Sequence, residues 1–197
     1  MNIVNMYGRE LGINGDAAVM IDALRPTPAA DLSVYGGTPM ALYKASASVD
    51  AAIVSYNYLK ANSLSTNVMP WGLSNFNKNA YKNEAFDPLA YNGSGKGSVF
   101  VDGRVTLFPG NFRQVDGTFL QVASFITTDT YTPGAPLFVN LELTSAGLAG
   151  ANFGKITSTK HTGTNDHTFC GTVVDTWTTN NVVALEMLIA RGVNVIS

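Results

Sequence analysis

The residue types best suited to chemistry gather in one short stretch in the C-terminal part of the chain. His161, Asp166, His167 and Cys170 follow one another closely, and imidazole, carboxylate and thiolate groups are the usual ligands of zinc. Their spacing, H-x5-H-x2-C, matches no standard zinc pattern, and the chain has no second cysteine. We interpret residues 164–166 as a turn between two strands. The group is then the solvated tip of a hairpin, with a metal site as the alternative.

Cys170 with either histidine would be the simplest nucleophile and base pair. A cysteine nucleophile needs a thiol pKa lowered by an adjacent imidazolium or a helix N-terminus. Cys170 instead lies in the β-favouring run 168–174, where it is expected to face the core as a small buried hydrophobe. A single cysteine cannot form an internal disulfide. The sequence therefore predicts no catalytic residues.

Residues 92–98, Asn-Gly-Ser-Gly-Lys-Gly-Ser, resemble a phosphate-binding loop only at first sight. That motif needs a glycine where Ala90 stands and a serine or threonine where Gly97 stands. The segment also leads into a predicted strand, whereas a phosphate site relies on the N-terminus of a following helix. We interpret residues 92–98 as a flexible joint, and we expect no cofactor.

Aromatic residues recur every five positions through the asparagine-rich segment 62–97. These residues are Trp71, Phe76, Tyr81, Phe86 and Tyr91. Large aromatic side chains anchor many protein interfaces. The pattern favours an arm that buries its rings against a neighbouring subunit. Two alternatives stay open: a face on which sugars stack, and rings that pack on the chain's own core.

The composition excludes several classes of protein. Charged residues make up 13% of the 197 residues, against about 25% in an ordinary soluble domain. A net charge of −2 gives no basic surface for a nucleic acid. The apolar fraction of 46% is enough for a real core, which argues against disorder. The apolar runs, such as 17–21 and 182–185, are too short for a membrane-spanning helix.

The C-terminal half reads as a series of short strands. Residues 98–101 and 104–108 flank Asp102-Gly103, a favoured two-residue hairpin turn. Residues 137–143 alternate apolar and more polar side chains, as expected for a half-buried strand. Residues 182–189 have helical propensity in part, but their length and neighbours favour a strand. Further strands are predicted at 119–127, 155–159, 168–174 and 193–196.

The N-terminal half is less regular. Ser48 could cap a helix over residues 48–61, and residues 17–22 could form a strand. Residues 62–97 are predicted to be a long loop or arm. The expected fold is therefore mainly β. A β-sandwich or barrel at 98–197 follows an irregular region at 1–97, which holds the arm and the candidate helix.

The course of strands and turns over residues 117–189 resembles that of head decoration proteins, also called cement proteins, of tailed bacteriophages. The resemblance is carried by YTPGAPLFV at 131–139, then 141–147 and 154–159, then CGTVVD at 170–175 and the strand at 183–188. In that family a small β-barrel or sandwich accompanies an arm. The resemblance implies a homotrimer on the capsid surface that binds the major capsid protein.

The expected function is thus a structural role in a virion, in which the chain stabilises an assembled head. Met1 is followed by no secretory signal, and the resemblance implies synthesis in the host cytoplasm. We expect no nucleic-acid or membrane partner. The alternatives are a receptor- or glycan-binding fibre protein of the virion, a small jelly-roll capsid protein, and an enzyme with a metal at His161, His167 and Cys170.

Overall fold

In the part of the chain that the structure describes, regular structure consists almost entirely of β-strands. The computed structural model describes residues 13–22, 36–43, 52–56, 70–74, 98–113, 119–141, 151–160, 168–179 and 182–190. Its strands are β1 (Ile13–Asp22), β2 (Pro39–Tyr43), β3 (Ala52–Ser55), β4 (Pro70–Ser74), β5 (Ser98–Leu107), β6 (Gly110–Arg113), β7 (Phe119–Val122), β8 (Pro136–Val139), β9 (Ile156–Thr157), β10 (Phe169–Thr179) and β11 (Val182–Ile189).

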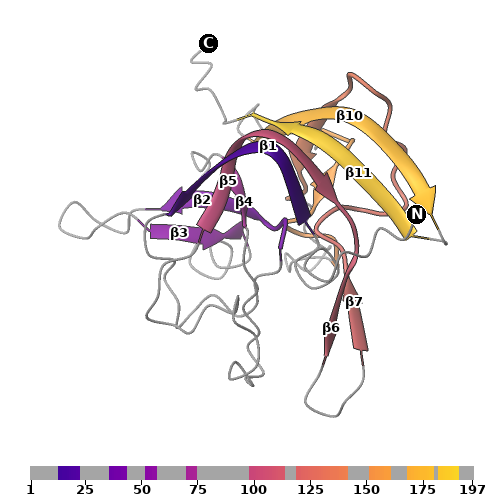
Figure 1. Ribbon diagram of the computed structural model, residues 1–197, viewed down its shortest axis with the longest axis horizontal. Helices are drawn as coiled ribbons and strands as arrows, with labels where there is room; N and C mark the ends of the chain where they lie inside the picture. Colours follow the sequence, from indigo (N-terminus) through magenta and orange to yellow (C-terminus); the bar gives the residue numbers. More distant parts are fainter. Residues whose placement is uncertain are drawn as a thin grey trace.

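Nine of these strands form one antiparallel sheet. Eight of them follow the order β3-β2-β4-β5-β11-β10-β8-β9, and β1 pairs with β5 beside this path. The sheet curls into a half-barrel, and Figure 1 shows β1, β5, β10 and β11 arching over a common interior. Strands β6 and β7 make a separate two-stranded sheet. The predicted mainly β, barrel-like fold is confirmed.

Strand β5 organises the sheet, because three strands pair with it. β1 runs along its whole length, from Ile13 opposite Leu107 to Asp22 opposite Ser98. β4 pairs with the beginning of β5, and β11 pairs with its end. Since a strand has only two edges, β4 and β11 must share the edge that β1 leaves open. β5 therefore joins the β3-β2-β4 part of the sheet to the β11-β10-β8-β9 part.

The change of partner takes place at Asp102 and Gly103. Gly103 has a φ of 96°, a conformation that glycine adopts without strain, and its N–H donates to Asp102 Oδ1 at 2.7 Å. The predicted hairpin turn at these two residues is wrong, because the chain continues through them as one strand. Pairing with β1 on one edge and β11 on the other outweighs the local turn preference. The turn residues bend the strand without reversing it.

Two corrections concern the N-terminal region. Residues 52–55, inside the predicted helix 48–61, form β3 and pair with β2. The β-branched pair Ile53-Val54 suits this strand better than a helix. Residues 70–74, inside the predicted arm, form β4 between β2 and β5. The remaining parts of the predicted helix and arm lie outside the described residues.

The C-terminal strands differ from the prediction in their packing and order. In β8 and just beyond it, Phe138 and Asn140 are buried as well as Leu137 and Val139, so both faces are covered. β8 also lies between β9 and β10. The predicted hairpin between residues 155–159 and 168–174 is therefore wrong, since these two strands are not neighbours. The predicted strand at 193–196 lies outside the described residues.

A single hydrophobic core fills the concave side of the sheet. Its members come from both predicted regions, for example Val54 and Leu73 from residues 1–97, and Leu107, Ile156 and Leu185 from residues 98–197. Strands β10 and β11 supply part of this core. The sequence predicts them at residues 168–174 and 182–189. The two regions are thus joined by shared hydrogen bonding and by shared packing.

The turn before β2 shows how tightly this core is closed. Gly37 has a φ of 85°, and a β-carbon placed on it would lie 2.6 Å from Ser124 Oγ and 2.9 Å from Leu107 Cδ2. The Gly37 N–H donates to the Ser74 carbonyl at 2.8 Å, and the Thr38 N–H donates to Ser74 Oγ at 3.1 Å. Only glycine fits this position.

Candidate functional site

Cys170 is the one member of the predicted chemical cluster whose surroundings are described. It lies in β10 and is 2% exposed. Burial raises the pKa of the thiol, the opposite of what a nucleophile needs. The interpretation of Cys170 as a small buried hydrophobe is confirmed. His161, Asp166 and His167 lie outside the described residues.

Two tyrosines share the interior around Cys170. Burial raises the pKa of Tyr56 well above its usual value, and the nearby Cys170 adds to the shift. Burial likewise raises the pKa of Tyr131, with Asp129 as the next cause. Tyr131 Oη donates to the Ile126 carbonyl at 2.8 Å, whereas Tyr56 Oη is buried without a hydrogen-bond partner. These groups stay protonated at neutral pH and hold the interior uncharged.

Metal-binding chemistry has no support in the part of the chain that the structure describes. Across the described segments, no three histidine, cysteine, aspartate or glutamate side chains lie close enough together to hold an ion. Asp129, which lies near the core, is committed to other partners: Thr157 Oγ1 donates to Asp129 Oδ2 at 2.5 Å and the Ser158 N–H donates to the same oxygen at 3.1 Å. Asp129 thus ties its own loop to β9.

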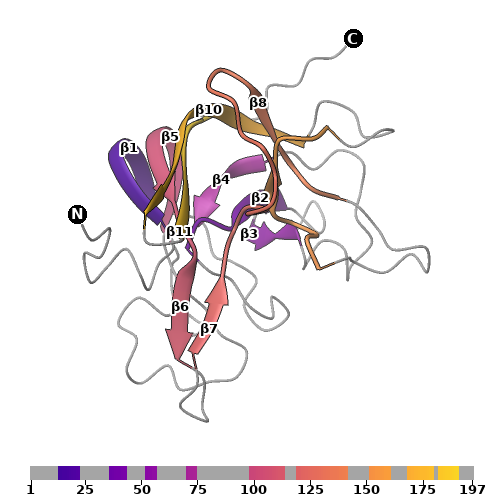
Figure 2. The ribbon, with the colours of Figure 1, turned by 90° about the vertical axis from the view of Figure 1, so that its right-hand side faces the viewer.

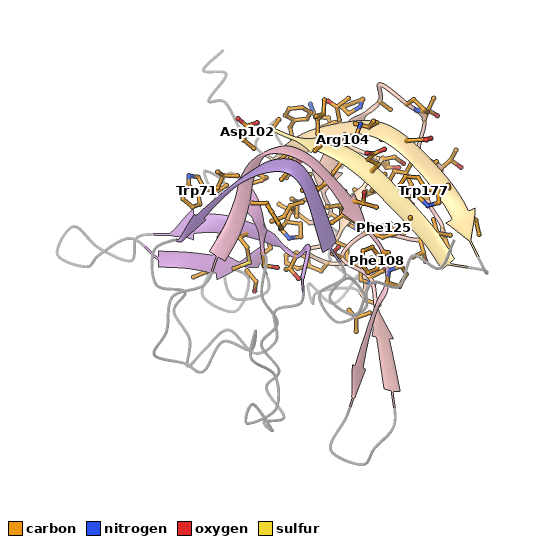
Figure 3. The ribbon with its side chains drawn as sticks, viewed as in Figure 1. Trp71, Asp102, Arg104, Phe108, Phe125 and Trp177 are labelled. Carbon is orange, nitrogen blue, oxygen red and sulfur yellow. The ribbon has the colours of Figure 1, made fainter. Side chains whose placement is uncertain are left out.

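Trp71 is the one residue of the predicted interface arm that is described. It lies in β4 and is partly buried. Phe76, Tyr81, Phe86 and Tyr91 lie outside the described residues, so the aromatic arm stays a prediction for them. Figure 3 shows Trp71 and Trp177 on opposite sides of the molecule. The two tryptophans therefore do not form one common surface.

The outer, convex face of β5, β11 and β10 is the first candidate interaction surface. Register places Thr106, Glu186 and Asp175 in one row across the three strands, and Arg104, Leu188 and Thr172 in the next. Arg104 Nε lies 2.7 Å from Glu186 Oε1. Leu188 is 48% exposed and is the only exposed large hydrophobic residue among those described. The face is therefore mostly polar, with one apolar position near its centre.

Trp177 extends this convex face along β10. It is partly buried and lies opposite Ala184 of β11, and Figure 3 shows it on the outer part of β10. Trp177 is not among the predicted site residues, because it lies beyond the strand predicted at residues 168–174. The alternation of Leu185, Met187 and Ile189 with Glu186 and Leu188 was a signal that could have located this outer face.

The hairpin of β6 and β7 is the second candidate surface. It begins at Gly110, two residues after the buried Phe108, and projects away from the main sheet in two perpendicular views (Figures 1 and 2). Its register places Phe112 opposite Leu120 and Arg113 opposite Phe119. Among the described strands, none pairs with the outer edge of either β6 or β7.

Comparisons with known proteins identify no relative of this chain. No family model, no curated protein and no solved structure matches it. In the described part of the chain, no helix has both the length and the hydropathy of a membrane span. The functional argument therefore rests on the chain's own surfaces.

Proposed function

We propose that this chain is a non-enzymatic structural protein of a virion, a decoration protein that binds the major capsid protein of an assembled head and stabilises it. The observation that carries the proposal is the β6–β7 hairpin, which projects from a curled, charge-poor sheet. A protein that holds neighbouring subunits together needs such a projecting element and a body that neighbours can cover. Catalytic groups are not required for this role.

Mass action supplies the mechanism. A protein that binds only the assembled shell stabilises that shell by its binding free energy, and each occupied site adds to the total. Interfaces built from threonine and asparagine side chains suit this role, because these groups do not titrate and tolerate bridging water. The strand-and-turn course at residues 117–189 supports a placement on the capsid surface, with a homotrimer as the expected assembly.

The test is the copy number of this chain in purified particles of the phage that encodes it. A decoration protein is expected in a fixed proportion to the major capsid protein, as measured by quantitative mass spectrometry and located by electron microscopy. Particles that lack the chain should release their nucleic acid at a lower temperature, and added purified chain should restore the higher value. Absence from particles, or a failure to bind such heads, would contradict the proposal.

The aromatic arm can be tested separately. Replacing Phe76, Tyr81, Phe86 and Tyr91 by serine should weaken binding to heads and leave the unfolding temperature unchanged if these rings contact a neighbouring subunit. Trp71 is left in place, because it belongs to β4. A large loss of stability in the free protein would instead show that the rings pack on the chain's own core.

A glycan-binding fibre protein is the second candidate, and Trp177 on the convex face favours it. Sugars stack on aromatic rings, and the exposed Asp175, two residues from Trp177 on the same face of β10, can accept hydrogen bonds from sugar hydroxyl groups. Specific and saturable binding on a glycan array, lost in Trp177→Ala, would support this function. A small number of copies confined to the tail or the vertices would support it over a decoration protein.

A further inference from the structure

Asp102 and Gly103 lie where the regular pairing of β5 is interrupted. The register between β1 and β5 is shifted between Asp16 and Val19, so Gly103 has no direct partner in β1. Asp102 is exposed, and Figure 3 shows it on the outer side of the arch. The Gly103 N–H donates to Asp102 Oδ1 at 2.7 Å. The backbone amide of Gly103 therefore lies against the carboxyl group of the residue before it.

This contact brings together the two groups of a common peptide rearrangement. A backbone amide nitrogen can attack the carboxyl carbon of the preceding aspartate and close a five-membered succinimide ring. Reacting groups that are held within about 3–3.5 Å of each other react faster than groups that must first meet. The hydrogen bond keeps the Asp102 carboxyl group beside the Gly103 nitrogen. Glycine has no β-carbon to obstruct the approach or to restrict rotation of its backbone.

We propose that Asp102 is a site of spontaneous isomerisation to isoaspartate, through a succinimide formed with Gly103. The Gly103 nitrogen forms a bond to Asp102 Cγ. The carboxylic acid gives up its hydroxyl group and the amide gives up its proton, and the two leave as one water molecule. One water molecule then opens the ring. Opening at Cγ restores aspartate, whereas opening at the main-chain carbonyl of Asp102 leaves the chain running through Cγ.

The proposed modification is independent of the proposed role in a virion. Water is its only co-reactant, and the overall change is an isomerisation in which nothing is oxidised or reduced. A chain that isomerises at Asp102 and ignores phage heads would satisfy this inference and contradict the proposed function.

Asp175 provides a matched comparison within the same protein. It is exposed, and the Thr176 N–H donates to Asp175 Oδ1 at 2.8 Å, so both aspartates make the same type of hydrogen bond. The following residue is the difference. Threonine is branched at Cβ and crowds the amide nitrogen, and Thr176 Oγ1 donates to the Ala184 carbonyl at 3.0 Å, which ties it to β11. Asp175 should therefore isomerise much more slowly than Asp102.

The position of this site in β5 gives the modification a consequence for the whole sheet. An isoaspartate lengthens the main chain by one carbon atom between Asp102 and Gly103. Val99 and Phe100 pair with β4 and β1 before this point, and Gly103–Leu107 pair with β11 after it. The longer chain cannot keep the register on both sides. The isomerised protein should therefore unfold at a lower temperature than the natural one.

The first experiment incubates the folded chain in water labelled with heavy oxygen, because each ring opening adds one oxygen atom from the solvent. Peptide mapping by mass spectrometry locates the label, and electron-transfer fragmentation distinguishes isoaspartate from aspartate. We expect label and isoaspartate to accumulate at Asp102 at least about tenfold faster than at Asp175. The same chain in urea sets the time that the reaction needs without the fold. Equal rates at the two aspartates, or no label at Asp102 within that time, would overturn the proposal.

A second measurement links the modification to the stability of the sheet. Asp102→Glu keeps the carboxylate but needs a less favourable six-membered ring, so this variant should age without isomerising. The isomerised fraction of the natural chain, separated by chromatography, should unfold at least about 2 °C below the unmodified fraction, whereas the aged variant should keep its unfolding temperature. Equal midpoints of the two fractions, or an equal loss in the aged variant, would show that β5 does not depend on the length of the chain at Asp102.

Discussion

Tyr56, Tyr131 and Cys170 place three weak acids inside one apolar core. Burial is the leading cause of the raised pKa of each group, because a charge is poorly solvated there. All three are neutral at physiological pH, so they stabilise the fold by packing and, for Tyr131, by hydrogen bonds to the Ile126 and Ile156 carbonyls. The same groups make the fold sensitive to alkali.

We predict that the free energy of unfolding falls as the pH rises above about 9. The unfolded chain loses these protons near the ordinary pKa values of 9.0 for cysteine and 10.0 for tyrosine, whereas the folded chain retains them. The unfolded state therefore binds fewer protons in this range, and each group contributes a loss of about 1.4 kcal/mol per pH unit. Urea unfolding at pH 7 to 11 measures the decline.

A matched variant assigns part of this effect. Cys170→Ala should delay the decline by about one pH unit, because only the tyrosines then remain and their ordinary pKa is higher. A natural chain whose stability is constant up to pH 11 would show that these groups are accessible to hydroxide.

Asp129 is a carboxylate that ties its own loop to β9 through two hydrogen bonds. We predict that Asp129→Ala lowers the free energy of unfolding by about 1–3 kcal/mol, because Thr157 Oγ1 and the Ser158 N–H both lose a charged acceptor. Asp175→Ala is the control, since Asp175 is exposed and lies opposite Glu186. Its effect should stay within about 0.5 kcal/mol. Similar losses in the two variants would contradict the anchoring role of Asp129.

At the scale of elements, β11 separates an inner row from an outer row. Leu185, Met187 and Ile189 belong to the core cluster, whereas Leu188 is exposed. We predict that Leu185→Ala lowers the free energy of unfolding by about 2–5 kcal/mol and that Leu188→Ala changes it by less than about 1 kcal/mol. Chemical denaturation of both variants measures the difference. A larger effect at Leu188 would mean that its outer side is covered in solution.

Local signals in the sequence located some elements better than others. The strand at Val182–Ile189 was predicted from its length and its neighbouring strands, and the structure confirms it. The hairpin predicted at Asp102-Gly103 is wrong, because the conformation there depends on β1, β4 and β11, which are distant in the sequence. Propensity alone could not show that residues 52–55 pair with β2. Local preference fails where a partner strand from elsewhere decides the conformation.

The candidate surfaces were harder to predict than the strands. The buried position of Cys170 follows from the strand around it, and the structure bears this out. The β6–β7 hairpin was not predicted, because residues 119–127 were interpreted as one strand. In the structure β7 ends at Val122, and an irregular segment that contains Asp129 follows it. Which strands leave the main sheet depends on tertiary packing, which no short window of sequence records.

At the scale of the whole molecule, both predicted regions contribute to one sheet and one core. Val54 and Leu73 lie in the same cluster as Leu107 and Leu185, and β4 and β1 pair with β5 across the predicted boundary at residue 97. A structure with a shared core gains most of its stability only when all its parts are in place.

We therefore predict a single cooperative unfolding transition for the described sheet. The calorimetric enthalpy should equal the van't Hoff enthalpy, and fluorescence of Trp71 and Trp177 in opposite parts of the sheet should report the same midpoint in single-tryptophan variants. Two separate midpoints would show that residues 1–97 and 98–197 unfold independently.

The sharing of one edge of β5 by β4 and β11 also has a consequence for biosynthesis. The first part of that edge pairs with β4, which the ribosome has already made, but Gly103–Leu107 must wait for Leu185–Ile189. During translation the apolar residues Val105 and Leu107 therefore stay on an unfinished edge until almost the whole sheet has been synthesised. Nascent chains that stop before Val182 are expected to bind chaperones or aggregate, since such an edge accepts strands from other chains.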